Sequence, residues 1–374
     1  MQKELLVSPQ IFKQMLDNDE VKFVFDLRNE DDFKDGKVEG RYEFETLNIP
    51  QEDFVGEEER HLSKFPKDKP IITICAHGDS SKYTAEMLLE KGYDAQSLEG
   101  GIDLWTEYYE THKCTDDPEI YQIYRVARGC ITHLLISDGE AVVIDAVRHT
   151  DKILKKVDEL KAKVKYVFDT HLQADHISGG KEIADITGIN YFMNPIDAQN
   201  ATFKYSHLKD GDTLSFGKCS IKVIHSPGHT PGSTSLLVNN KYLFTGDLIM
   251  KTSIGRPDLG GASEEWTRLL YDTLFSRYAS LGDDVVIFPS HASSIKEQDN
   301  GVVTLTMGTA RKESDLYQIK DFTKFLEYVN SSLPANPERY QEIRKVNLGI
   351  INPDEKKRKE LEIGKNLCGM TKGT

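Results

Sequence analysis

The chain has 374 residues, 38% of them hydrophobic and 29% charged, with a formal net charge of −14 at pH 7. This length allows two or more domains with separate cores, and the acidic balance argues against nucleic acid or an anionic membrane as a partner. The absence of a long apolar run or signal-peptide pattern, together with five widely spaced cysteines, favours a reducing cytoplasm.

The segment 5–112 is predicted to alternate between strands and helices. Ser8 and Pro9 have the residue types of an N-cap and a first helical position. A strand is expected to follow this helix at residues 21–26. The apolar face that the helix would bury consists of Ile11, Phe12, Met15 and Leu16.

A second apolar run, residues 70–74, is predicted to form a buried parallel strand that ends at Cys75. A loop then leads into a helix expected over 82–91, which Gly92 can end in a left-handed conformation. Loop amides and a helix N-terminus stabilise negative charge on sulfur. An inert buried cysteine is the alternative, but the Gly- and Ser-containing loop favours a reactive thiolate.

The segment 5–112 resembles a rhodanese domain. The resemblance rests on Asp26-Leu27-Arg28 after the first strand, on Cys75 at the start of the loop, and on Leu98-Glu99-Gly100-Gly101 followed by Trp105. It implies that Cys75 is catalytic, because in this family the loop amides hold a cysteine persulfide that passes sulfur between a donor and an acceptor.

The loop departs from the rhodanese pattern at two positions. Ala76 and Ser80 stand where the family usually carries arginine, and Asp79 adds a negative charge. The pocket is therefore less cationic than usual, and we expect weak activity toward thiosulfate. A persulfide on a small thiol is the expected partner.

The polar, turn-forming stretch around Asp116-Asp117-Pro118 predicts a boundary between two domains. We expect a rhodanese-like domain at 1–113, a linker at 114–119, and a second domain with a C-terminal extension at 120–374. Three strands and a helix are predicted to open the second domain, and Asp138-Gly139 is a hairpin signal between the last two strands. These elements are expected at 121–126, 130–137, 141–145 and, for the helix, 150–162.

Four later strand ends each close on a histidine or aspartate beside small or turn-forming residues. The first carries the stretch 171–176, and the others carry His229, Asp247 and His291. Clustered His and Asp side chains are candidate metal ligands. The first stretch alone would also suit a polar loop that caps the next helix, but four such ends in series favour loops that converge on one site.

This series resembles the metallo-β-lactamase superfamily, whose pattern is H-x-H-x-D-H, then a histidine in a Gly-Pro turn, an aspartate after T-G, and a last histidine after a strand. Residues 120–310 carry every element except one, because Gln173 replaces the second histidine. The resemblance implies an α/β chain: a parallel rhodanese-like sheet with flanking helices, followed by an αββα sandwich.

The substitution at Gln173 helps to decide between chemistries. The dinuclear zinc hydrolases of the superfamily use both histidines of H-x-H for one metal, and glutamine is a poor replacement for imidazole. Persulfide dioxygenases bind a single iron with only the first histidine, the turn histidine and the later aspartate, which correspond to His171, His229 and Asp247. The resemblance thus implies one Fe(II) per chain, with open positions for O2 and substrate.

Other polar residues of the series would then surround the iron ligands. Asp175, His176 and His291 are expected to orient ligands or substrate, with a second metal pocket as the alternative. Arg256 could hold a substrate carboxylate, unless it is a surface arginine in a turn, and Gln173 could touch substrate or only fill space.

The C-terminal segment carries less information. A helix is expected over 337–345 with Pro337 in its first turn, and the basic run 356–359 is interpreted as a solvated face. The segment around Cys368 loosely resembles the end of some persulfide dioxygenases, and this cysteine is expected to be structural.

The resemblances together predict a dioxygenase that oxidises a low-molecular-weight thiol persulfide with O2 to sulfite and thiol, fused to a sulfurtransferase domain. The expected partners are small molecules, with a homodimer allowed by the resemblance and neither nucleic acid nor membrane involved. A zinc-dependent hydrolase of thioester type and a sulfur carrier or sensor are the alternatives.

Overall fold

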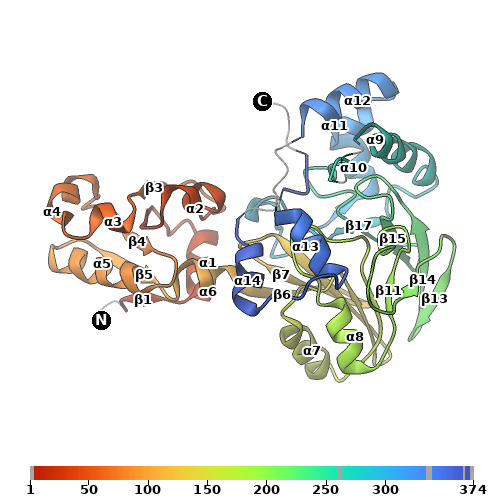
Figure 1. Cartoon of the computed structure of the whole chain (residues 1–374), viewed down its shortest axis with the longest axis horizontal. Helices are drawn as coiled ribbons and strands as arrows, with labels where there is room; N and C mark the ends of the chain where they lie inside the picture. The colour runs from red at the N-terminus through yellow and green to blue at the C-terminus, as the bar shows by residue number, and fades with distance from the viewer. Residues whose placement is uncertain (1–3, 260, 262, 334–338, 365–366, 371–374) are drawn as a thin grey trace.

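The computed structural model describes residues 4–259, 261, 263–333, 339–364 and 367–370. A smaller N-terminal lobe lies beside a larger lobe that contains the rest of the chain (Figure 1). Within the described ranges, no helix is both long and apolar enough to cross a membrane.

The first lobe is built on a five-stranded sheet with the order β1-β5-β4-β2-β3, in which every pairing is parallel. Strands β2, β4 and β5 are buried along their whole length, as expected for a parallel sheet covered on both faces. The strands are β1 (Leu6–Val7), β2 (Phe23–Asp26), β3 (Glu45–Asn48), β4 (Ile71–Ile74) and β5 (Ala95–Leu98). The helices are α1 (Pro9–Asp17), α2 (Glu30–Asp35), α3 (Gln51–Phe54), α4 (Glu58–His61), a 3-10 turn (Leu62–Lys64), α5 (Asp79–Glu90) and α6 (Gly101–Thr106).

Helix α1 begins as predicted, with the Ser8 hydroxyl accepting a hydrogen bond from the amide of Ile11 and proline in the first turn. The predicted buried face is wrong at Ile11, whose side chain is 47% exposed. Lys13 is buried instead, because its ammonium group reaches Asp17 at 2.5 Å and Glu110 of the second lobe at 3.4 Å. Contacts between lobes therefore override the local periodicity.

The second lobe is a sandwich of two sheets, with strand orders β12-β11-β10-β9-β8-β7-β6 and β13-β14-β15-β16-β17-β18. Buried residues from both sheets form one cluster, which includes Leu135 and Ile144 from the first sheet and Val223 and Phe244 from the second. The first sheet comprises β6 (Tyr109–Asp116), β7 (Glu119–Arg125), β8 (Cys130–Ser137), β9 (Glu140–Ile144), β10 (Lys163–Phe168), β11 (Tyr191–Met193) and β12 (Ser206–His207). The second comprises β13 (Thr213–Phe216), β14 (Cys219–His225), β15 (Thr234–Val238), β16 (Tyr242–Gly246), β17 (Val286–Pro289) and β18 (Leu305–Thr306).

Helices cover the outer faces of the two sheets (Figure 1), so the predicted αββα sandwich is confirmed. Helices α7 and α8 pack on the first sheet through Ile153 and Ile183, and α9 and α12 pack on the second through Leu270 and Phe325. These helices and the smaller ones are α7 (Thr150–Glu159), α8 (Gly180–Thr187), α9 (Ser263–Asp272), a π-helical turn (Thr273–Arg277), a 3-10 turn (Ile295–Glu297), α10 (Met307–Glu313), α11 (Asp315–Gln318), α12 (Phe322–Ser331), α13 (Arg339–Asn347) and α14 (Glu355–Leu361).

The stretch 114–119, expected to be a linker, is instead part of a β-hairpin. Strand β6 runs to Asp116 and pairs antiparallel with β7 over its whole length. Turn-forming residues mark a hairpin as well as a linker, so the local composition could not distinguish the two. We propose a domain boundary between the end of α6 at Thr106 and the start of β6 at Tyr109.

The two lobes meet through a shared apolar cluster. Phe12, Leu16 and Trp105 of the first lobe belong to the same cluster as Val126 and Ile295 of the second. Helix α14 lies on the side of the second lobe that faces the first (Figure 1), and it carries the whole basic run 356–359. The predicted helix over 337–345 corresponds to α13, and Pro337 lies outside the described residues.

Glu362, just after α14, joins three segments of the second lobe. Its carboxylate accepts hydrogen bonds from Arg125 at 2.7 Å, Arg148 at 2.8 Å and the amide of Ile177 at 2.8 Å. Burial would raise the pKa of Glu362, but the two guanidinium groups outweigh it and lower the pKa to about 2. The fold is thus stabilised by an ionised carboxylate at this position.

Glu362→Gln should lower the free energy of unfolding at pH 7 by about 3–5 kcal/mol, because two buried guanidinium groups lose their counter-charge. Since the pKa is depressed in the folded state, the difference is fully present above the unfolded value of about 4.3 and shrinks as the pH falls toward 2. Denaturant titrations at several pH values measure this, with the exposed Glu360→Gln as the control. A loss that did not depend on pH would contradict the ionic explanation.

Candidate functional site

The strand ends that the sequence singled out meet in the second lobe. Strand β10 of the first sheet leads into the loop that begins at Asp169, whereas β14, β16 and β17 of the second sheet precede His229, Asp247 and His291. Because the two sheets face each other, side chains from loops of both sheets converge. All of these histidine and aspartate side chains are buried.

His171, His229 and Asp247 form one compact group. The Nε2 atoms of the two histidines lie 3.7 and 3.8 Å from Oδ2 of Asp247. Among the described residues, none of these three buried atoms has a hydrogen-bond partner, and unpaired buried polar atoms are costly. Three converging donor atoms without partners fit a metal ion, and two imidazoles with one carboxylate suit a first-row transition metal.

Neighbouring groups fix how the two imidazole rings point. The Nδ1 group of His229 donates to the carbonyl of Arg256 at 2.9 Å, and Nδ1 of His171 lies 2.9 Å from the hydroxyl of Thr170. The Thr170 hydroxyl in turn donates to Asp145. Burial lowers the pKa of His171 to about 3, although Asp247 opposes the shift. The ring is therefore neutral, with its Nε2 lone pair directed into the group.

Two glycines let the backbone approach these ligands closely. Gly246 has φ +58°, and a Cβ there would lie 2.3 Å from the Thr170 hydroxyl oxygen. A Cβ at Gly255 would lie 2.3 Å from the carbonyl oxygen of Asp247 and 2.9 Å from the His229 ring. Larger residues at either position would displace a ligand, which explains the glycines in the T-G-D and G-R-P segments.

Asp175, His176 and His291 form a second buried group beside the first. His291 contacts Asp247 through Nδ1 and lies 2.9 Å from Asp175 through Nε2, and Asp175 is also 3.1 Å from Nδ1 of His176. Cys130 completes the group, with its sulfur 3.7 Å from Asp175. Like the first group, this one has ligand atoms close enough together to hold a metal ion.

Two cysteines at this site were not among the predicted site residues. Cys130 begins β8, about forty residues before the histidine motif, and nothing in its local sequence marks it. Cys368, which was expected to be structural, places its sulfur within 4.8 Å of carboxylate oxygens of Asp175 and Asp247. Its weak resemblance to the end of persulfide dioxygenases was the available signal.

Gln173 and Arg256 are both buried at the site. The Gln173 amide donates to Asp145 at 3.2 Å, and its Oε1 has no hydrogen-bond partner in the part of the chain that the structure describes. Arg256 is 1% exposed and binds both carboxylate oxygens of Asp258, at 2.6 and 2.7 Å, so the interpretation as a surface arginine is wrong. Its binding of a substrate carboxylate stays a prediction, and Asp258 would compete for the guanidinium group.

Cys75 lies in a cradle of donors at the end of β4. Its sulfur accepts hydrogen bonds from the amides of Gly78 at 3.1 Å and Ser81 at 3.4 Å. Helix α5 begins at Asp79, earlier than predicted, so Ser81 lies in its first turn. Amides and a helix N-terminus directed at sulfur stabilise a thiolate or a persulfide anion.

The D-x-R and E-G-G features of the first lobe have structural explanations. Arg28 binds both carboxylate oxygens of Asp26, which ties the loop after β2 to the strand. Gly101 has φ +59°, and a Cβ there would lie 2.3 Å from the carbonyl oxygen of Cys75. The E-G-G turn can therefore pack directly against the cysteine loop.

Comparison with known proteins agrees with this division of the chain. The model of the rhodanese-like domain matches residues 8–108, and the model of the metallo-β-lactamase superfamily matches residues 127–291. The mitochondrial persulfide dioxygenase ETHE1 of Bos taurus is 28% identical over 218 residues, which cover 55% of this chain and 80% of that protein. Hydroxyacylglutathione hydrolase GloC of Haemophilus influenzae is 25% identical over 181 residues, which cover 42% of this chain and 84% of that protein.

Among solved structures, a metallo-β-lactamase from Staphylococcus aureus subsp. aureus COL aligns with a TM-score of 0.57 and 25% identity, covering 63% of this chain and 74% of that one. The buried His, Asp and Cys groups are typical of a metal site in this superfamily. The chain therefore combines an N-terminal rhodanese-like domain with a C-terminal domain of the metallo-β-lactamase superfamily.

Proposed function

We propose that this chain is a persulfide dioxygenase fused to a sulfurtransferase domain. It would oxidise the persulfide of a low-molecular-weight thiol with O2, giving sulfite and the free thiol. The observation that carries the proposal is the group of His171, His229 and Asp247, whose three orphaned donor atoms converge while Gln173 interrupts the motif of a dinuclear site. Similarity to ETHE1 of Bos taurus, a persulfide dioxygenase, supports it.

The residues of the second lobe would hold one Fe(II) and control its surroundings. Fe(II), when bound, supplies adjacent open positions for O2 and for the terminal sulfur of the persulfide. The carbonyl of Arg256 and the hydroxyl of Thr170 keep the two imidazoles in position. His291, in contact with the second carboxylate oxygen of Asp247, would leave Oδ2 as the ligand atom.

The first lobe would carry sulfur on Cys75 as a persulfide. The amides of Gly78 and Ser81 already donate to the cysteine sulfur and would stabilise negative charge during transfer. Placing both activities on one chain raises the local concentration of the shared intermediate. A cytoplasmic location and a homodimer stay predictions.

Metal analysis and oxygen uptake of the full-length protein test the proposal. Protein made without added metal and then loaded with Fe(II) should hold roughly one iron per chain, bound by His171, His229 and Asp247, because in the second group His291 is already paired with Asp175 and Asp247. It should consume O2 when given glutathione persulfide or another small persulfide. Stoichiometric zinc together with thioester hydrolysis and no oxygen uptake would contradict it.

A zinc-dependent hydrolase is the second candidate. The group of Asp175, His176, His291 and Cys130 favours it, since imidazole and thiolate suit zinc, and a hydrolase such as GloC is similar over much of its length. Zinc, when held by these residues, would activate a water molecule for attack on the substrate. Against it, Gln173 removes one imidazole from the motif that the dinuclear hydrolases use.

A further inference from the structure

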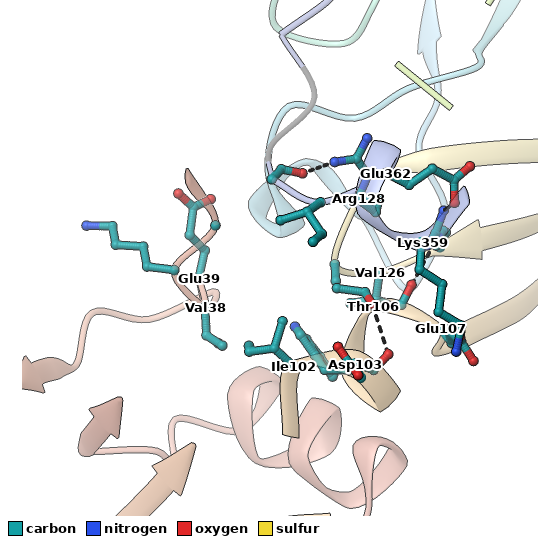
Figure 2. Close-up of a pocket in the computed structure, with 18 of the residues that line it drawn as sticks. Val38, Glu39, Ile102, Asp103, Thr106, Glu107, Val126, Arg128, Lys359 and Glu362 are labelled. Carbon is teal, nitrogen blue, oxygen red and sulfur yellow. Dashed lines mark hydrogen bonds and ion pairs between the residues drawn. The ribbon is translucent and has the colours of Figure 1, made fainter. Parts of the chain in front are cut away.

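A cavity of about 300 Å³ lies between the two lobes. Figure 2 shows Val38 and Ile102 of the first lobe on one side, and Val126, Arg128 and Lys359 of the second on the other. The volume is at the lower end of the range for small-molecule sites. Neither lobe encloses this space alone, so a site here exists only in the two-domain chain.

The cavity adjoins the surroundings of both reactive centres. Ala76 and His77, which directly follow Cys75, form part of its wall in the first lobe. In the second lobe the wall includes Gly129 and Ala292, which are the chain neighbours of Cys130 and His291. The cavity wall is therefore continuous along the chain with the cysteine loop on one side and with Cys130 and His291 on the other.

The wall carries charges of both signs as well as apolar side chains. Lysines and arginines nearly balance aspartates and glutamates, while Val38, Ile102 and Val126 add apolar surface. Arg128 is 3% exposed, and its Nε has no hydrogen-bond partner among the described residues. Its other two nitrogens donate to the carbonyls of Gly364 and Asp175, so the guanidinium group is held in place with Nε as the nitrogen that has no partner.

We propose that this cavity binds a thiol of amino-acid or peptide type, the carrier that exchanges sulfur with Cys75. The carboxylates of such a thiol would bind the arginines and lysines of the cavity wall, and its amine would bind the aspartates and glutamates. Its short apolar stem would contact the apolar side chains. A dianion such as thiosulfate would need a wall with a large excess of positive charge, which this cavity lacks. This inference rests on the proposed sulfur transfer and names its substrate class.

The transfer itself needs no additional reactant. The thiolate of the bound carrier attacks the outer sulfur of the Cys75 persulfide, forming a new S–S bond while the bond to Cys75 breaks. Cys75 leaves as a thiolate, and the proton stays on the transferred sulfur. The amides of Gly78 and Ser81 donate hydrogen bonds to the Cys75 sulfur and would stabilise the negative charge on the departing thiolate. The reverse reaction loads Cys75 from the carrier persulfide through the same contacts.

Filling the cavity tests the proposal in the full-length protein. Ile102→Trp adds bulk on the cavity side of α6, whereas Leu104→Trp makes the same change at an exposed position of the same helix that does not line the cavity. Cys75 is first loaded with inorganic polysulfide, and its discharge to glutathione, cysteine, coenzyme A or cyanide is followed by mass spectrometry of the Cys75 peptide. Ile102→Trp should slow discharge to glutathione and cysteine roughly tenfold or more, because the acceptor thiol no longer fits in the narrowed cavity.

Discharge to cyanide, which needs no cavity, should change less than about twofold in either variant, and Leu104→Trp should match the wild type throughout. Lys359→Glu, an exposed change on the opposite wall that also breaks the ion pair with Glu107 at 2.8 Å, should slow discharge to glutathione about threefold. Unchanged discharge to glutathione and cysteine in Ile102→Trp would overturn the inference, as would sulfur transfer to coenzyme A alone.

A binding measurement separates this inference from the proposed function. Calorimetry with S-methylglutathione, which cannot accept sulfur, should show binding that weakens roughly tenfold in Ile102→Trp and not in Leu104→Trp. If this binding pattern held but Cys75 took up no sulfur, the proposed transferase role would be refuted. The cavity would still be a binding site for the thiol. Equal binding by both variants would refute the site whatever Cys75 does.

Discussion

His229→Ala should abolish oxygen uptake by the iron-loaded protein. The variant removes one of three grouped ligand atoms and leaves one imidazole, from His171, and one carboxylate, from Asp247. Loss of an orienting partner alone costs 10–100-fold in metal affinity, so loss of a ligand should cost about 100-fold or more. Iron per chain and oxygen uptake with glutathione persulfide, measured on the same preparations, check this result.

The matched control is His207→Ala, because His207 is exposed on β12 and belongs to neither ligand group. It should keep both the iron content and the oxygen uptake of the wild type. Full activity in His229→Ala would place the metal elsewhere and remove the basis of the proposal. A wild type that binds persulfide without consuming O2 would favour the carrier or sensor alternative.

The local parts of the site could be predicted from sequence, whereas the contacts between sheets could not. Each candidate ligand follows an apolar run, and His229 and Asp247 sit directly after a glycine, so His171, His229 and Asp247 could be found from their own neighbourhoods. Cys130 reaches the second group only because the loops of two sheets meet. No periodicity or spacing within the sequence of β8 could indicate that contact between the two sheets.

The errors in the fold prediction have the same origin. Lys13 is buried because Glu110 of the other lobe lies within 3.4 Å, which no pattern within α1 could indicate. The turn at Asp117 was assigned to a linker because polar turn residues serve both linkers and hairpins. Its true role depends on the pairing of β6 with β7, a contact between segments. The interdomain cavity was hidden for the same reason, since both lobes form its wall.

Cys75→Ser should eliminate sulfur transfer by the first lobe and leave oxygen uptake by the second largely intact. A serine hydroxyl can take the place of the sulfur in the amide cradle of Gly78 and Ser81, but it cannot form a persulfide. Cys114→Ser is the matched control, because burial raises the pKa of Cys114 to about 12 and keeps it an unreactive thiol. Discharge of sulfur to glutathione and oxygen uptake are measured on all three proteins.

The two readouts together decide whether the centres are chemically independent. Among the described residues, His171, His229 and Asp247 share no side-chain contact with Cys75, and the cavity between the lobes is walled by other residues. A persulfide supplied in solution should therefore reach the second lobe without passing through Cys75. If oxygen uptake vanished in Cys75→Ser while iron content and folding matched the wild type, the sulfur would have to travel through Cys75 first. The two centres would then act in sequence, with Cys75 supplying the sulfur that the second lobe oxidises.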